Sequence, residues 1–193
     1  MKERALTGII LILLILLGGV GYVAWNSAKD KQEPAPIAEV PVGVVYTNQD
    51  LGITFTQPEG YHLSATISPE SASTGDISLI EEGMYKEFTE SNEPREAPPS
   101  ILLSVRSLES PSSIEDWLRE NEQYSQYQDA AHEPLMVSGI NAISYEADGL
   151  YQTRYVAFTS NKKVYLFSVQ FLERTDALVN DFNRIIQSLT ISQ

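Results

Sequence analysis

The stretch DLGITFTQPEGY, residues 50–61, decides how the folded part of this chain begins. Ile53 and Phe55 alternate with threonines, and this period of two predicts a half-buried β-strand. Gly52 and Gly60 lie on either side of the strand and allow turns, while the proline of the stretch ends it. The alternative is a ligand-binding loop, which glycines also permit. We interpret the stretch as a strand between two turns.

Short apolar or alternating runs elsewhere predict more strands. They cover residues 42–46, 61–67, 76–82, 101–108 and 134–149, the last broken at Gly139 and followed by a turn at Asp148-Gly149. In the 101–108 run, Ile101, Leu103 and Val105 share one face. Asn161-Lys162 separates two longer apolar runs and predicts a β-hairpin.

Two segments have the spacing of amphipathic helices. Ser112 is predicted to cap the first, with Glu115 closing a capping box, and this helix runs to about Tyr124 with Ile114, Trp117 and Leu118 on one stripe. Thr175 is predicted to cap the second, whose apolar face holds Leu178, Phe182, Ile185, Ile186 and Leu189. Residues 83–100 are acidic and contain prolines, so we expect an exposed loop there. The order of strands and helices predicts an α+β domain, a mostly antiparallel sheet with helices packed on it.

Residues 5–25 contain no charged side chain and predict a membrane-spanning helix. A helix of this length reaches about 31 Å, which matches the hydrocarbon core of a bilayer. Lys2 and Arg4 precede it, and Tyr22 and Trp25 lie at its far end, where interfacial aromatics are expected. A cleaved signal peptide is the alternative, but its apolar region is usually shorter and ends at an A-x-A-like site.

These features give the predicted domain organisation. Residues 1–4 form a cytoplasmic stub, 5–25 an uncleaved signal anchor, 26–41 a proline-containing linker, and 42–193 an extracytoplasmic domain. The chain is expected to be a single-pass cell-membrane protein with its N-terminus inside and its C-terminus outside. The membrane is thus one expected partner, reached through the N-terminal helix.

Charge and composition exclude several classes of function. The formal net charge is −13 over 193 residues, and such an acidic surface repels nucleic acid. The same charge can serve solubility alone, or attract cations or a basic partner. The chain has no cysteine, which rules out disulfides, thiol nucleophiles and Cys-ligated zinc.

Catalytic and metal-binding motifs are missing from the sequence. The only histidines, His62 and His132, are not part of a recognisable serine triad, and no G-x-S-x-G elbow, EF-hand, Walker or dinucleotide pattern occurs. Two isolated histidines do not supply the three or four protein ligands that a zinc site needs. Asp129 and Glu133 beside His132 could gather around a cation, but a solvated loop is the simpler interpretation. We therefore predict no catalytic residue, metal or cofactor.

Two groups of residues are candidates for a partner or ligand surface. Glutamates and aromatics crowd the predicted acidic loop, and two tyrosines lie in the polar run QYSQYQ; aromatics among polar residues are enriched at interfaces. The candidates are Glu81, Glu82, Tyr85, Glu87, Phe88, Glu90, Tyr124 and Tyr127. The aromatics could instead cover small cores, and the acidic stretch could be a solvated loop.

Several of these elements together resemble PsbP-like domains. The matching residues are Tyr46 and Asn48, the opening stretch from Leu51 to Tyr61, the 101–105 strand, Trp117-Leu118, Val137-Ser138-Gly139 before Ala142, the 151–171 hairpin, and a last helix closing on residues 186–191. PsbP-like domains are α/β/α sandwiches, typified by the photosystem II extrinsic protein and shared by a nuclear-import factor that binds the Ran GTPase. The resemblance covers residues 46–191, and membrane-tethered bacterial members are closest in layout.

The resemblance implies a fold and a non-enzymatic binding or assembly role. Our leading expectation is a membrane-anchored, extracytoplasmic interaction or assembly module whose partner is another envelope protein. The alternatives are a binding domain for a divalent cation or small polar ligand, a hydrolase with an unrecognised site, and a pilin-like subunit. The last lacks a G-F-T-L-x-E processing signal before the apolar helix.

Overall fold

The computed structural model describes residues 43–192 except 70, 72, 92, 93, 111, 129 and 130. The predicted stub, membrane helix and linker lie outside these residues, as does Asp129 of the weighed cation cluster. Among the described residues, no helix is long and apolar enough to cross a bilayer.

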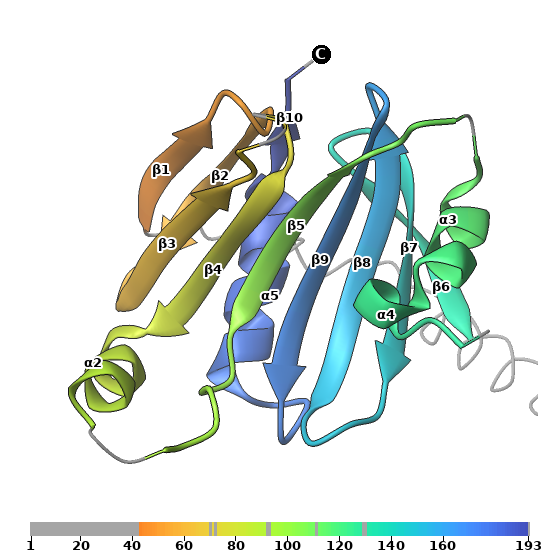
Figure 1. Ribbon diagram of the computed structural model, residues 1–193. Helices are drawn as coiled ribbons and strands as arrows, with labels where there is room; N and C mark the ends of the chain where they lie inside the picture. Colours follow the sequence, from red (N-terminus) through yellow and green to blue (C-terminus); the bar gives the residue numbers. More distant parts are fainter. Residues whose placement is uncertain are drawn as a thin grey trace, which may run out of the picture. The chain divides into compact units, whose positions relative to one another are not determined.

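Two antiparallel sheets form the framework (Figure 1). The larger sheet has the strand order β3-β4-β5-β9-β8-β7-β6, with bounds Tyr61–Ile67, Gly75–Glu81, Ile101–Ser107, Lys163–Phe171, Gln152–Ser160, Ile140–Ala147 and His132–Val137. The smaller sheet has the order β1-β2-β10, with bounds Gly43–Asn48, Ile53–Pro58 and Thr190–Ile191. The predicted strands are confirmed, and so is a domain dominated by an antiparallel sheet.

Helices cover both faces of the large sheet (Figure 1). On one face lies α5 (Ala177–Ser188), which packs on β9 and on β2 of the small sheet. On the other face lie the short helices α3 (Ile114–Glu120) and α4 (Glu122–Ser125). A further helix, α2 (Glu82–Glu90), follows β4 directly. Helices on both faces satisfy the predicted α+β class.

The main core lies between α5 and the sheets. Ile101, Leu103 and Val105 of β5 are fully buried there, as their shared face predicts, and Phe182 of α5 packs in the same core. Each such side chain contributes about 1.5–3 kcal/mol by leaving water. This core fixes α5 against the sheet.

The opening stretch is a strand between two turns, as its alternation predicts. Ile53 and Phe55 of β2 are buried, and Gly52 and Gly60 adopt the positive φ angles of 73° and 83° that glycine allows. The ligand-loop alternative is therefore not supported.

The predicted hairpin is also confirmed. Asn161 and Lys162 join β8 to β9 with φ angles of 52° and 59°, as a tight two-residue turn requires. Ser138 and Gly139 make a similar turn between β6 and β7, where the sequence predicts a break.

Residues 82–90 are helical, so the prediction of an exposed loop over 83–100 is wrong in its first half. The prolines that suggested a loop all lie after α2, at positions 94, 98 and 99. The segment before them holds good helix formers, and Tyr85 and Phe88 come half-buried onto one side of it. The boundary between the helix and the proline-containing segment lies at Glu90, inside the stretch that was predicted as one loop.

Both predicted helix caps are wrong by one residue. Ser113, not Ser112, caps α3: its Oγ accepts the Asp116 amide at 3.1 Å, so the partner three residues on is Asp116 and not Glu115. Residues Ser112 to Glu115 have the capping-box pattern as well, and sequence spacing alone does not separate the two registers.

At the second helix, the N-cap residue is Asp176 and not the predicted Thr175. The Asp176 side chain makes no cap hydrogen bond to α5, and accepts instead the amides of Leu172 and Glu173 in the connection from β9. The helix predicted to reach Tyr124 without interruption is also divided. Asn121 leaves helical geometry, with φ −119° and ψ 40°, and separates α3 from α4.

Candidate binding groove

The outer face of the large sheet is only half covered, and this leaves a groove. The helices α3 and α4 are short, and they pack over β7 and β8. Trp117, Leu118 and Tyr127 form a second core there with Tyr145, Tyr155 and other sheet residues. The same face of β4 and β5 remains outside this core.

A buried hydrogen-bond hub holds the helical cover on the sheet. The Ser125 hydroxyl donates to the Leu118 carbonyl at 2.7 Å, and the Tyr145 hydroxyl donates to the Ser125 carbonyl at 2.8 Å. Burial, the largest cause, raises the pKa of Tyr145, and the neighbouring Tyr155 adds to the shift. The edge of the cover, and with it the wall of the groove, is therefore fixed.

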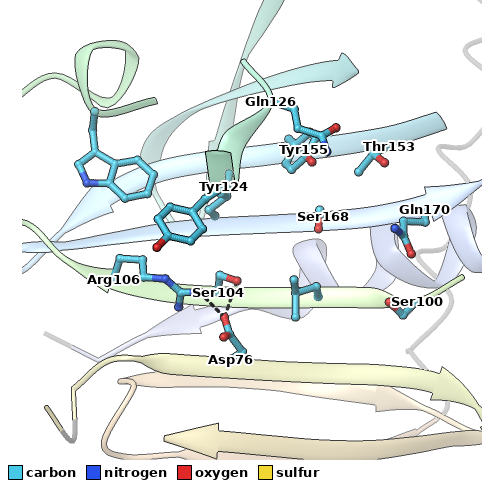
Figure 2. A pocket seen from close by; sticks show the side chains of 13 residues that line it. Asp76, Ser100, Ser104, Arg106, Tyr124, Gln126, Thr153, Tyr155, Ser168 and Gln170 are labelled. Atoms are coloured by element: carbon cyan, nitrogen blue, oxygen red, sulfur yellow. Dashed lines mark hydrogen bonds and ion pairs between the residues drawn. The ribbon is translucent and has the colours of Figure 1, made fainter. Parts of the chain in front are cut away.

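A cavity of about 210 Å³ lies where the cover ends (Figure 2). Its floor comes from alternate residues of four neighbouring strands, and its wall comes from α3, α4 and the residue after α4. The polar and aromatic lining residues are Asp76, Ser100, Ser104, Arg106, Trp117, Tyr124, Gln126, Thr153, Tyr155, Ser168 and Gln170.

The two charged residues among the described lining of this cavity neutralise each other. Arg106 donates from Nη2 to Asp76 Oδ1 at 2.8 Å, and the Ser104 hydroxyl donates to the same oxygen at 2.6 Å (Figure 2). Arg106 also donates from Nη1 to the Gly75 carbonyl, and its guanidinium lies 5.7 Å from the ring centre of Tyr124. The cavity floor thus carries no net charge.

The hydroxyls of Thr153 and Ser168 face the cavity without a protein partner. Their residues are only 7% and 9% exposed, and neither side chain hydrogen-bonds to any other described residue. No polar side-chain atom among the described residues is both sealed from solvent and unpaired, so these hydroxyls open into the groove. The Tyr155 hydroxyl is similar, and burial raises its pKa. Their hydrogen-bonding capacity is therefore open to a molecule that enters the groove.

A second cavity continues the groove past Arg106. Its volume is about 410 Å³, and it shares Arg106, Trp117 and Tyr124 with the first. Glu109 and Glu120 add negative charge to this end. Tyr124 is 54% exposed, so its ring stands between the two cavities with much of its surface available for contact.

Six of the eight predicted surface residues come together, but not at the groove. Glu81 and the α2 residues Glu82, Tyr85, Glu87, Phe88 and Glu90 lie at the far end of β4 (Figure 1). Glu82 pairs with Lys86 at 3.1 Å and Glu87 with Arg95 at 2.8 Å. Among the described residues, no group of three or more His, Cys, Asp or Glu side chains could hold a metal ion. The acidic helix is therefore partly neutralised by Lys86 within it and by Arg95 beyond its end.

The two remaining predicted residues have opposite positions. Tyr124 is exposed on the wall of the groove, as an interface residue should be. Tyr127 is only 1% exposed and packs edge-on against Tyr145 at 5.0 Å, so its prediction as a surface residue is wrong. The alternative weighed for such aromatics, a cover over a small core, describes Tyr127.

The two histidines lie away from the groove. His62 stacks on Tyr85 with ring centres 3.4 Å apart, and His132 Nδ1 lies 3.0 Å from the Tyr127 hydroxyl. Neither lines either cavity of the groove. The described residues of the groove therefore contain no imidazole that could serve as a base for a serine.

Sequence reasoning missed most of the groove. Asp76, Ser104, Arg106, Thr153 and Ser168 lie in strands that were predicted correctly. The sequence did contain a signal for the groove. These residues occupy the positions of each strand that face one side of the sheet, and they are polar, whereas a helix packed on that side would require apolar residues. A face that alternates polar with apolar indicates that the helices leave part of the sheet open.

The chain is similar to the solution structure of the cyanobacterial PsbP (CyanoP) from Synechocystis sp. PCC 6803, with a TM-score of 0.49 and 14% sequence identity over 81% of this chain and 99% of that chain. No protein-family model and no curated protein matches the chain. What the groove can bind therefore has to follow from its own side chains.

Proposed function

We propose that this chain is a membrane-anchored, non-catalytic binding module whose working surface is the groove beside α3 and α4. The observation that carries the proposal is the half-covered sheet face, where polar side chains and an exposed aromatic line a concave surface. Concave sites of mixed apolar and polar character are the usual binding sites of proteins. The leading partner is another envelope protein.

Groove chemistry supports binding more than catalysis. Among the described residues that line the inner cavity, Asp76 is the only carboxylate, and it is occupied by Arg106 and Ser104. Hydrolysis by paired carboxylates or by an activated serine needs a second titratable group within hydrogen-bond reach. The described residues of the inner cavity offer none beyond this pair and the tyrosines.

The membrane part of the proposal rests on the uncharged stretch at residues 5–25. It is tested by alkaline carbonate extraction of the full chain and of a variant that lacks this stretch. The proposal expects the full chain to stay in the pellet and the variant to be released. Release of both would remove the anchor from the proposal.

The partner is tested by formaldehyde crosslinking in native membranes, followed by mass spectrometry of the captured full chain. We compare the wild type with Tyr124→Arg, which blocks the groove, and with Met136→Arg on the edge strand β6, which is also exposed and lines neither cavity of the groove. The proposal expects one abundant adduct that Tyr124→Arg removes and Met136→Arg leaves. An adduct unaffected by Tyr124→Arg would place the partner elsewhere.

A second candidate function is the binding of a small polar molecule in the same groove. The hydroxyls of Thr153 and Ser168 favour it, because they open into the groove, bond to no other described residue, and lie on its floor, where a flat protein surface seldom reaches. The acidic helix α2 is a weaker location for such a ligand, since two of its glutamates are already paired.

A further inference from the structure

From the chemistry of this groove, we infer that its ligand is a neutral sugar, one ring lying over Thr153 and Ser168 and a neighbouring ring against Tyr124. The inference rests on the second candidate function and gives it a ligand class. It is carried by three features of the groove, which are its charge, its hydroxyls and its aromatics.

The charge excludes ionic ligands. The Asp76–Arg106 pair leaves the inner cavity neutral, and Arg106 already donates to a carboxylate and a backbone carbonyl. An anion would share Arg106 with Asp76, whose carboxylate would repel it, and it would approach past Glu109 and Glu120 at the outer end. A cation would find one carboxylate whose charge is already balanced. A neutral ligand avoids both costs.

The floor and wall of the inner cavity together offer both donors and acceptors. A hydroxyl both donates and accepts, and an amide side chain does the same through its two ends. The inner cavity presents hydroxyls from Ser100, Thr153 and Ser168 and amides from Gln126 and Gln170 (Figure 2). A ligand with hydroxyls on adjacent carbons matches such a set, because each of its groups can also donate and accept.

The aromatics supply the apolar part of recognition. Tyr124 and Trp117 lie between the two cavities, and the Tyr124 ring is more than half exposed. The C–H face of a sugar ring is apolar and packs on an aromatic ring. The inner volume of about 210 Å³ is small beside ordinary ligand pockets of roughly 300–1,000 Å³, so it suits a single ring.

The test is saturation-transfer NMR on the full-length chain in a zwitterionic detergent, because a maltoside detergent would itself compete. The probes are maltose, cellobiose and N,N′-diacetylchitobiose, with digalacturonate as the anionic probe and an acetylated, amidated tetra-alanine as the peptide probe. We expect at least one neutral disaccharide to bind with a Kd below about 10 mM and digalacturonate not to bind.

Matched variants locate the binding. Thr153→Val keeps the shape of the side chain and removes its hydroxyl, and it should weaken binding about threefold to tenfold. Ser168→Ala should act in the same way, and it replaces Thr153→Val if that variant does not fold. The control is Thr159→Val, on the same strand and the same face but outside the groove. It should leave the affinity unchanged.

Several results would overturn the inference. They are binding of digalacturonate alone, binding of the peptide alone, no binding by any probe, or sugar binding that neither Thr153→Val nor Ser168→Ala weakens. The outcome is separable from the test of a protein partner. An adduct sensitive to Tyr124→Arg without sugar binding would retain the binding module and reject its sugar ligand.

Discussion

Replacing Tyr145 by Phe should loosen the helical cover that walls the groove. The hydroxyl of Tyr145 is the only described group that donates to the buried Ser125 carbonyl, at 2.8 Å. Its removal leaves that carbonyl unpaired, which costs about 1–3 kcal/mol of the free energy of unfolding. The ring itself stays, so its stacking on Tyr155, with ring centres 4.8 Å apart, is kept.

The neighbouring tyrosine provides the control. Tyr155 belongs to the same stack, but its hydroxyl bonds to no other described residue. Tyr155→Phe should therefore cost less than about 0.5 kcal/mol, as is usual for a change that breaks no protein hydrogen bond. The pair of variants separates the hydrogen bond from the aromatic packing.

Urea unfolding of residues 41–193 measures the difference. Trp117 is the only tryptophan of this fragment and lies in the cover, so its fluorescence follows the cover directly. With an m value of about 2 kcal/mol/M, Tyr145→Phe should lower the urea midpoint by about 0.5–1.5 M. Equal midpoints for the two variants would refute the view that the Tyr145–Ser125 bond holds the cover.

Three further predictions concern the core, a helix cap and pH. Phe182→Ala in α5 removes a fully buried ring and should cost about 3–5 kcal/mol in urea unfolding, while Asn180→Ala on the exposed side of α5 should cost little. Ser113→Ala should cost about 1 kcal/mol and Ser112→Ala much less, and similar midpoints for the two would contradict the position of the cap. Burial is the largest cause that raises the pKa of four tyrosines above 10.0 in the folded chain; they are Tyr61, Tyr145, Tyr155 and Tyr165. As the pH rises, the unfolded chain therefore loses these protons before the folded chain does. The free energy of unfolding should fall above about pH 10, by up to about 1.4 kcal/mol per pH unit for each tyrosine. Burial lowers the pKa of Lys163 in the folded chain, so this group makes the free energy of unfolding rise with pH. That contribution stops growing near pH 10.5, the ordinary pKa of lysine. Urea unfolding between about pH 9 and 12 tests the sum, and stability that is flat or rising there would contradict it.

The strands could be predicted because their signals are local. Alternation around Ile53 and Phe55, the shared face of the 101–108 run, and the Asn161-Lys162 turn each depend on a few consecutive residues, and all were confirmed. Helix ends were harder to predict, because adjacent residues such as Ser112 and Ser113 can both cap a helix. Which of them does so depends on where the backbone enters helical geometry.

The site could not be predicted in the same way, because it depends on where a helix stops. Tyr124 and Tyr127 lie three residues apart in one polar run, yet one is exposed and the other buried. The break at Asn121 and the left-handed residue Gln126, with φ 50°, turn Tyr127 into the sheet. Asp76, Ser104 and Ser168 meet only through strand pairing across the sheet, which no local pattern records.

We propose that the groove, and not the acidic helix α2, is the working surface of this chain. The most direct measurement is the yield of photo-crosslinking in native membranes with a photoreactive residue at position 124, on the groove, or at position 85, on α2. We expect a specific adduct from position 124 and none from position 85. An adduct from position 85 alone would contradict it and would move the binding surface to α2.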